Sequence, residues 1–142
     1  MKIRVLLVDD EKEFVEALSQ RLELREFDAK TATSGDEAVS LIQREDFDVI
    51  VLDVLMPGKD GIATLKEIKN LNPLTQVIML TGHATVETAI AGMKSGAYDY
   101  LIKPTETEAL VKKIQGAYKL KAEHEQRIRQ AEIDNIIKRR GW

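Results

Sequence analysis

The sequence predicts an α/β domain in which one parallel sheet is covered by helices on both faces. Short apolar, β-branched segments alternate along the chain with segments whose apolar residues have helical spacing. This alternation requires parallel strands joined by helical crossovers, because each helix returns the chain to the same end of the sheet. The 142 residues suffice for one well-cored domain and are too few for two ordinary ones.

Five strands and five helices are expected in this alternation. The strands are predicted at residues 3–8, 28–32, 48–53, 76–80 and 97–102. The helices are predicted at residues 11–25, from 34 through 42, from 60 or 61 to 71, at 85–94, and from 106 to about 140. Residues 49–52 are all apolar, which predicts a strand buried on both faces. The count and length suit the flavodoxin-like strand order 2-1-3-4-5.

Helix ends carry ordinary start and stop signals. Ser34 is expected to cap the second helix, with Glu37 completing a capping box. Pro73 stops the third helix and Gly96 follows the fourth. The last helix contains no proline and has Gly116 as its interior breaker, so it is expected to continue as an extension of the fifth helix.

Polar residues follow four of the apolar strands. Asp9 and Asp10 come directly after the first strand, and Asp53 ends the third. Thr81 follows the fourth strand and Lys103 the fifth. The carboxyl ends of parallel strands lie along one edge of the sheet, where open α/β sheets bind their ligands. These five side chains are therefore expected to converge, and burial in an apolar layer does not explain an aspartate there.

Three carboxylates at one edge need a positive partner. They repel one another by roughly 1 kcal/mol per pair in water and by more near a protein surface. No His or Cys accompanies them, so all-oxygen ligation favours a hard divalent ion, and Mg²⁺ is the expected cofactor. A phosphate substrate suits this site, because Lys103 supplies a positive charge, Thr81 a hydroxyl, and a carboxylate can act as nucleophile.

At these residues the chain resembles the receiver domains of two-component response regulators. The motifs are Val8-Asp9-Asp10-Glu11, residues 52–61 around Asp53, Thr81-Gly82 and Lys103-Pro104. They occur in the family's order and spacing and cover about residues 3 to 118. The chain is similar to the chemotaxis receiver in being nearly all receiver, whereas residues 81–85 and 96–101 look most like receivers of the nitrogen-regulation type.

The resemblance implies that Asp53 accepts a phosphoryl group from a phosphohistidine of a sensor histidine kinase. Asp10, Asp53 and the backbone carbonyl of Leu55 would bind Mg²⁺ directly, and Asp9 would assist through water. Lys103 would pair with the phosphoryl oxygens, and its bond to the following proline is expected to be cis, as in the family. The chain would then be a phosphorylation switch rather than a turnover enzyme.

The resemblance also implies two switch residues. Thr81 would move toward the phosphoryl group, and Tyr100 would turn inward behind it. This population shift would change the face made by the fourth helix, the fifth strand and the fifth helix, through which the chain would bind a partner or form a homodimer. Leu55 and His83 flank the path of attacking water in the family, and the sequence leaves open whether they lengthen or shorten the phosphorylated state.

Taken singly, these residues have ordinary structural explanations. The acids at 9–11 suit a helix N-terminus, Asp53 a turn, Thr81 a cap, Tyr100 a half-buried strand position and Lys103 a solvated surface. Their joint occurrence at one sheet edge favours a site. His83 lacks a second His or Cys beside it, which argues against a metal role for this residue.

Composition excludes some function classes. A net charge of −3 and a pI near 5.5 argue against direct nucleic-acid binding. The absence of cysteine fits a reducing compartment and excludes a disulfide framework. The longest apolar runs have only strand length, and the first strand begins without a signal-peptide pattern. A cytoplasmic protein without a membrane partner is therefore expected.

The last residues are expected to form a separate segment, with a receiver domain at 1–120 and a helical extension at 121–142. Residues 119–140 carry seven basic and four acidic side chains, and their apolar residues form no sustained heptad seam because Lys121 and His124 interrupt it. The extension is either a solvated helix or a dimer or partner helix. In the second case the expected anchors are Ile133, Ile136, Ile137 and Trp142.

The output is predicted to be protein contact by a stand-alone receiver, because little chain follows residue 120. Three alternatives stay open: a fragment of a larger transcriptional regulator, a phosphorelay member that passes its phosphate to a histidine phosphotransfer protein, and a phosphate-independent adaptor. Two enzyme or carrier classes fail at named residues. A haloacid dehalogenase phosphatase needs an acid at Leu55, and a flavin or dinucleotide carrier needs a phosphate-binding loop at residues 9–11.

Overall fold

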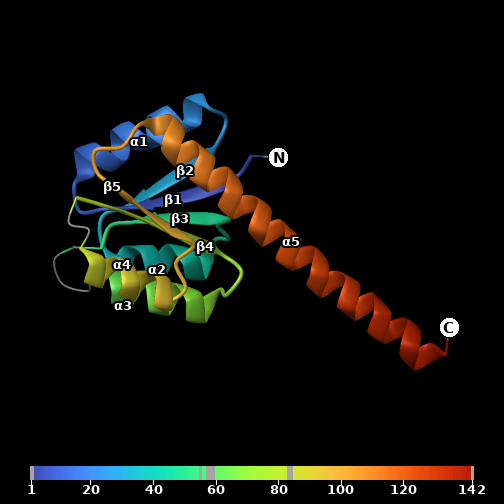
Figure 1. Cartoon of the computed structure of the whole chain (residues 1–142). Coiled ribbons are helices and arrows are strands. Elements are labelled where there is room, and N and C mark those ends of the chain that lie inside the picture. Colours follow the sequence, from blue (N-terminus) through green and yellow to red (C-terminus); the bar gives the residue numbers. More distant parts are fainter. Residues whose placement is uncertain (1, 55, 57–59, 83–84, 142) are drawn as a thin grey trace.

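The computed structural model describes residues 2–54, 56, 60–82 and 85–141, and strands and helices alternate through them (Figure 1). The strands are β1 (Arg4–Val8), β2 (Asp28–Ala32), β3 (Val49–Leu52), β4 (Gln76–Thr81) and β5 (Asp99–Ile102). The helices are α1 (Lys12–Leu24), α2 (Gly35–Arg44), α3 (Gly61–Leu71), α4 (Val86–Lys94) and α5 (Thr107–Arg140). The predicted alternation is confirmed.

All five strands pair in parallel in the order β2-β1-β3-β4-β5, which confirms the flavodoxin-like arrangement. Helices α1 and α5 cover one face of the sheet, and α2, α3 and α4 cover the other (Figure 1). Because every connection is a crossover, each strand presents its carboxyl end to the same edge. The sheet therefore brings together segments that are far apart in the sequence.

Two apolar clusters fill the space on either side of the sheet. Alternate residues of each central strand point into different clusters, so that Leu7 packs with α1 and α5 whereas Leu6 packs with α2 and α3. All four residues of β3 are buried, as expected for the strand at the centre of a doubly covered sheet. This burial fixes the position of the residue that follows β3.

Several element ends differ by a residue or two from the sequence prediction. The last strand begins at Asp99 rather than at residue 97, although the Tyr98 amide already donates to the Val77 carbonyl at 2.7 Å. Ser34 caps α2 as predicted, by accepting from the Glu37 amide at 3.1 Å. In a capping box the Glu37 carboxylate would accept from the Ser34 amide, and this part of the prediction is wrong. The carboxylate accepts instead from the amide of the preceding residue, Thr33, at 3.1 Å.

Helix α5 is continuous for 34 residues and projects well beyond the sheet (Figure 1). A Cβ at Gly116 would lie 2.6 Å from the Tyr98 hydroxyl oxygen, so this glycine gives Tyr98 room against the helix. From residue 126 to 141 every residue except Ile137 is exposed, including the expected anchors Ile133 and Ile136. The fourth expected anchor, Trp142, lies outside the described residues. Within the described ranges, no helix combines the length and apolarity that a bilayer crossing demands.

Candidate functional site

Backbone pairing carries the candidate residues past the ends of their strands. The Asp53 amide donates to the Val8 carbonyl at 2.9 Å, and the Asp9 amide donates to the Ala32 carbonyl at 3.1 Å. On the other side of the sheet centre, the Lys103 amide donates to the carbonyl of Thr81 at 2.8 Å. These bonds extend the sheet ladder by one residue at several strand ends. The predicted convergence of polar residues at one edge therefore has a backbone cause.

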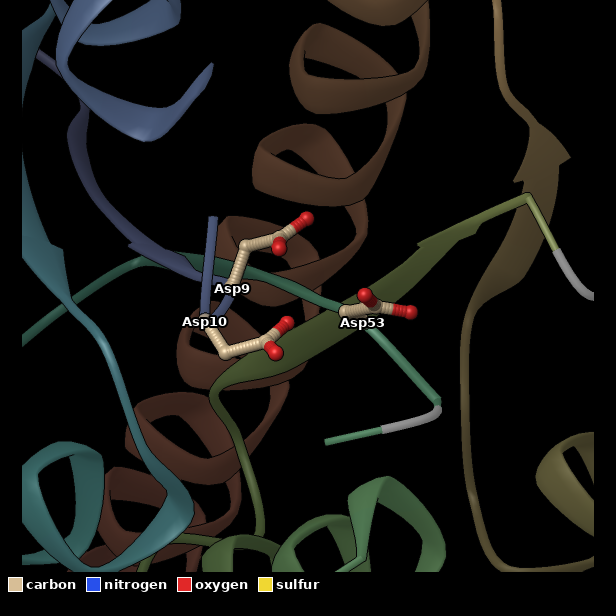
Figure 2. A group of neighbouring side chains, drawn as sticks. All are labelled: Asp9, Asp10 and Asp53. Atoms are coloured by element: carbon tan, nitrogen blue, oxygen red, sulfur yellow. The ribbon is translucent and has the colours of Figure 1, made fainter. Parts of the chain in front are cut away.

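Asp9, Asp10 and Asp53 form a compact group of carboxylates (Figure 2). One carboxylate oxygen of each residue lies within 4.8 Å of the others. Figure 2 shows that they come from the ends of two neighbouring strands, with Asp9 and Asp10 after β1 and Asp53 after β3. Asp9 and Asp53 are buried, with 3% and 5% exposure, whereas Asp10 is exposed. The group is thus reachable from solvent on the Asp10 side.

Lys103 supplies the positive charge that was predicted beside the three aspartates. Its Nζ forms an ion pair with Asp9 and lies 3.3 Å from Glu11 Oε1 and 3.7 Å from Asp53 Oδ2. Burial by itself would lower the pKa of the Lys103 ammonium, but the hydrogen bonds to Asp9 and Glu11 and the charges of Asp9 and Asp53 outweigh it and raise the pKa. Lys103 is therefore fully charged at neutral pH.

One lysine does not balance this cluster. Asp9, Asp10, Asp53 and Glu11 bring four carboxylates to this edge, and Lys103 pairs with three of them, Asp9, Asp53 and Glu11. Asp9 is oriented in part by the Glu11 amide, which donates to its Oδ1 at 2.9 Å. All-oxygen ligands with an opening to water match the preference of Mg²⁺ for a few carboxylates plus waters. The donor set therefore fits a hard divalent cation.

Gly61 holds the start of α3 against the backbone that follows Asp53. A Cβ on Gly61 would lie 2.3 Å from the Asp53 carbonyl oxygen and 2.5 Å from Val54 Cα. The Gly61 amide donates to the Val54 carbonyl at 2.8 Å. Any side chain at residue 61 would displace this segment, so the glycine in the 52–61 motif has a steric role that its spacing alone does not reveal.

The two expected switch residues have different environments. Thr81 is the last residue of β4 and is 1% exposed, whereas Tyr100 on β5 is 37% exposed. The bond between Lys103 and Pro104 is cis, as expected. Leu55, whose carbonyl was expected to bind the metal, and His83 lie outside the described residues.

Two contacts of Lys103 were not anticipated from the sequence. Glu11 belongs to the first sequence motif, where it was given no role of its own, and Phe14 lies within the helix predicted at residues 11–25. The ring of Phe14 lies beneath the ammonium, with its centroid 4.3 Å from Nζ. Helical spacing identifies Phe14 as inward-facing but carries no signal that a lysine 89 positions later meets it.

Comparison with protein families gives a match to the response regulator receiver domain over residues 5–115. The chain belongs to this family. Among curated relatives, it is 40% identical over 116 residues to the transcriptional regulatory protein ZraR of Salmonella typhimurium, covering 82% of this chain and 26% of the relative. It is 36% identical over 112 residues to a putative NtrX-like response regulator of Rickettsia conorii, covering 78% and 24%. The receiver thus spans about a quarter of the length of these relatives.

Solved receiver structures match the same fold. A CheY-like receiver domain protein from Methanospirillum hungatei superposes with a TM-score of 0.84 at 27% identity, covering 87% of this chain and 99% of that one. A response regulator protein from Burkholderia pseudomallei, solved with a phosphorylated aspartic acid, calcium ion and citrate, has a TM-score of 0.77 at 26% identity. This match covers 99% of the present chain and 86% of the Burkholderia pseudomallei chain. The resemblance to chemotaxis and nitrogen-regulation receivers is confirmed.

Proposed function

We propose that this receiver accepts a phosphoryl group on Asp53 from the phosphohistidine of a sensor histidine kinase, with Mg²⁺ as cofactor. The observation that supports this most directly is a buried Asp53 beside two further aspartates and a charged lysine. The cluster has more negative charge than Lys103 balances, so it is suited to a divalent cation and a phosphoryl group together. The Burkholderia pseudomallei response regulator, which carries a phosphorylated aspartic acid, is consistent with this chemistry.

The transfer would proceed by attack of an Asp53 carboxylate oxygen on the phosphorus. The new O–P bond forms as the P–N bond to the kinase histidine breaks, and the imidazole nitrogen leaves with the bonding electron pair. Asp9, Asp10 and Asp53 would hold the Mg²⁺, together with the Leu55 carbonyl expected from the family. Bound there, the ion would neutralise charge on the phosphoryl oxygens. The chain then acts as a switch rather than as a turnover enzyme.

Lys103 would exchange partners during this reaction. Its ammonium is held by Asp9 and lies 3.7 Å from Asp53, so a short movement brings it to an oxygen of a phosphoryl group on Asp53. Asp9 is then released for the cation site. The raised pKa keeps Lys103 protonated beside Asp9. A phosphoryl group is also anionic and would favour the ammonium form, so no proton has to be transferred when the partner changes.

The switch would act through Thr81 and Tyr100. Thr81 ends β4 beside the edge that holds Asp53, and its hydroxyl would contact the phosphoryl oxygens. Tyr100 is now partly exposed, and inward rotation would bury its ring behind Thr81. Phosphorylation would favour the inward state because only that state gives the phosphoryl group its hydroxyl contact.

The face that responds is apolar and exposed. On α4, β5 and α5 it includes Val86, Ile90, Met93, Tyr100, Ile102 and Tyr118, each at least 37% exposed. We propose that a downstream protein, a histidine phosphotransfer protein or a second copy of the chain binds this α4-β5-α5 face or the α5 helix. In this proposal the receiver is residues 1–120, residues 121–142 are a helical extension, and the protein acts in the cytoplasm without direct contact to nucleic acid. The stand-alone receiver stays a prediction, because the chain spans about a quarter of the relatives described above, and one of them, ZraR, is a transcriptional regulatory protein.

Phosphorylation by phosphoramidate or acetyl phosphate, followed by intact mass, tests the proposal. The wild-type chain should gain the mass of one phosphoryl group only when Mg²⁺ is present, and Asp53→Asn should gain none. Asp48→Asn is the matched control, because Asp48 precedes the same strand at its opposite end. Failure of the wild type to gain mass with either donor would support the phosphate-independent adaptor instead.

A further inference from the structure

We propose that Phe14 is a positioning residue for Lys103, holding the ammonium over the face of its ring while the lysine moves from carboxylate to phosphoryl oxygen. This role rests on the proposed phosphoryl transfer to Asp53. It goes beyond the family motifs, which include Lys103 but not Phe14.

The geometry of the ring supports this role. Phe14 lies in the first turn of α1, and its centroid is 4.3 Å from Lys103 Nζ, well inside the range of a cation–π contact. The Lys103 side chain is only 15% exposed, so little water competes with the ring for the ammonium. Such contacts are strongest where the cation is partly desolvated.

Phe14 also borders two cavities, one beside the aspartates and one beside the lysine. It lines a cavity of about 10 Å³ shared with Asp9 and Asp53, and an outer cavity of about 160 Å³ shared with Lys103 and Pro104. The ring therefore lies between the acidic cluster and the outer surface beside the β5–α5 connection. A side chain in this place can limit the directions in which the ammonium moves.

An aromatic ring suits the exchange of partners better than another carboxylate would. Asp9, Asp53 and Glu11 all attract Lys103, but each carries a full negative charge that would repel an incoming phosphoryl group. The face of a phenylalanine attracts the ammonium without that charge. The ring can thus keep its contact with Lys103 before and after the phosphoryl group arrives, which preorganises the cation for the reaction.

The competing explanation is that Phe14 only fills space. Its ring packs against the apolar cluster between the sheet and helices α1 and α5. Phe14→Leu removes the ring and keeps an apolar side chain, whereas Phe14→Tyr keeps the ring face. Phe27→Leu is the matched control, because Phe27 belongs to the same cluster and has no cation over its ring among the described residues.

Two measurements on the full chain separate these explanations. The first is the rate of Asp53 phosphorylation by phosphoramidate with saturating Mg²⁺, since a small donor needs no kinase docking. The second is the NMR signal of the Lys103 ε-methylene protons, which lie near enough to the ring to be shifted by it. Phe14→Leu should slow phosphorylation by about threefold to tenfold and abolish the ring-induced shift. Phe14→Tyr should retain both, and Phe27→Leu should retain the rate.

The outcomes are distinct. An unchanged rate in Phe14→Leu, or an equal loss in Phe27→Leu, would overturn the positioning role and leave a packing role. An unchanged Lys103 signal in Phe14→Leu would overturn the contact itself. If the wild type takes no phosphoryl group while its Lys103 signal shows the ring shift, the proposed function fails, and the role of Phe14 in it fails for that separate reason.

Discussion

The two ends of strand β3 each carry an aspartate that meets a partly buried lysine. At the carboxyl end Asp53 lies near Lys103, and at the amino end Asp48 pairs with Lys121 of α5, with 3.1 Å between Nζ and Oδ1. The side chains of the two lysines are similarly covered, with exposures of 15% and 13%. In both, burial would lower the pKa of the ammonium and acidic neighbours raise it. A raised lysine pKa therefore does not distinguish a functional site from a structural ion pair.

The number of positive partners available to the carboxylates does distinguish the two ends of β3. Asp48 uses both of its oxygens, one for Lys121 and the other for the Arg4 amide at 2.8 Å, and Glu125 completes the lysine's surroundings at 3.3 Å. At the other end, the described residues bring four carboxylates together with one lysine, Lys103. We call the amino end of β3 the balanced end, because each oxygen of Asp48 has a donor, and its contacts link β1, β3 and α5. The unbalanced end has a surplus of negative charge that a cation would remove, so the surplus of charge marks the site.

The largest expected effect is at the balanced end. Asp48→Ala leaves the Arg4 amide without its acceptor and leaves Glu125 as the acidic partner of the Lys121 ammonium, and should lower the free energy of unfolding by about 2 kcal/mol. Urea denaturation followed by circular dichroism measures this loss. Asp28→Ala is the control, because its ion pair with Arg4 is 3.9 Å long and half exposed, so it should cost less than about 0.5 kcal/mol. Equal losses in the two variants would contradict the comparison.

Magnesium binding should depend only on the unbalanced end. Asp10→Asn should weaken Mg²⁺ binding by at least roughly tenfold, the loss that even an outer-shell partner of a metal can cause. Isothermal titration calorimetry with MgCl₂ measures the affinity. Asp48→Asn should bind Mg²⁺ as the wild type does, because Asp48 lies at the opposite edge of the sheet. Wild-type affinity in Asp10→Asn would mean that Asp10 is not a ligand.

The sequence was sufficient to predict which residues meet at the site and insufficient to predict their individual contacts. Apolar strand periodicity and parallel crossovers together bring Asp9, Asp53 and Lys103 to one edge, so their convergence was predictable. The pairing of Asp48 with Lys121 was not, because Lys121 read only as a charge that interrupts a heptad. That contact depends on how α5 is rotated and tilted against the sheet. Helical periodicity does not determine the rotation or the tilt accurately enough to predict a hydrogen bond. The same limit applies to Phe14 beneath Lys103.

A smaller effect of opposite sign is expected in the metal-free protein. Asp10→Asn removes one of the surplus carboxylates and should raise the free energy of unfolding by about 0.5 kcal/mol without Mg²⁺. The same urea titration in the presence of EDTA measures it. Added Mg²⁺ should stabilise the wild type more than this variant, because ligand binding stabilises in proportion to affinity. Destabilisation of the metal-free variant would show that Asp10 supports the fold rather than the site.

The smallest expected effect is the response of the balanced end to alkaline pH. Because pairing raises the folded-state pKa of Lys121 above its ordinary value of 10.5, the stability from this pair is full below that pH and is lost as the pH rises through the folded-state pKa. Asp48→Asn keeps a hydrogen-bond acceptor but removes the charge, so the stability difference between wild type and this variant should be constant from about pH 7 to pH 9 and shrink above about pH 10.5. Urea unfolding of both proteins across this range measures the difference. The stability difference could instead persist undiminished at about pH 12, where lysines lose their charge. The Asp48 carboxylate would then stabilise the fold through its hydrogen bond to the Arg4 amide and not through the Lys121 ammonium. In that case the two ends of β3 would differ in the kind of interaction rather than in charge balance.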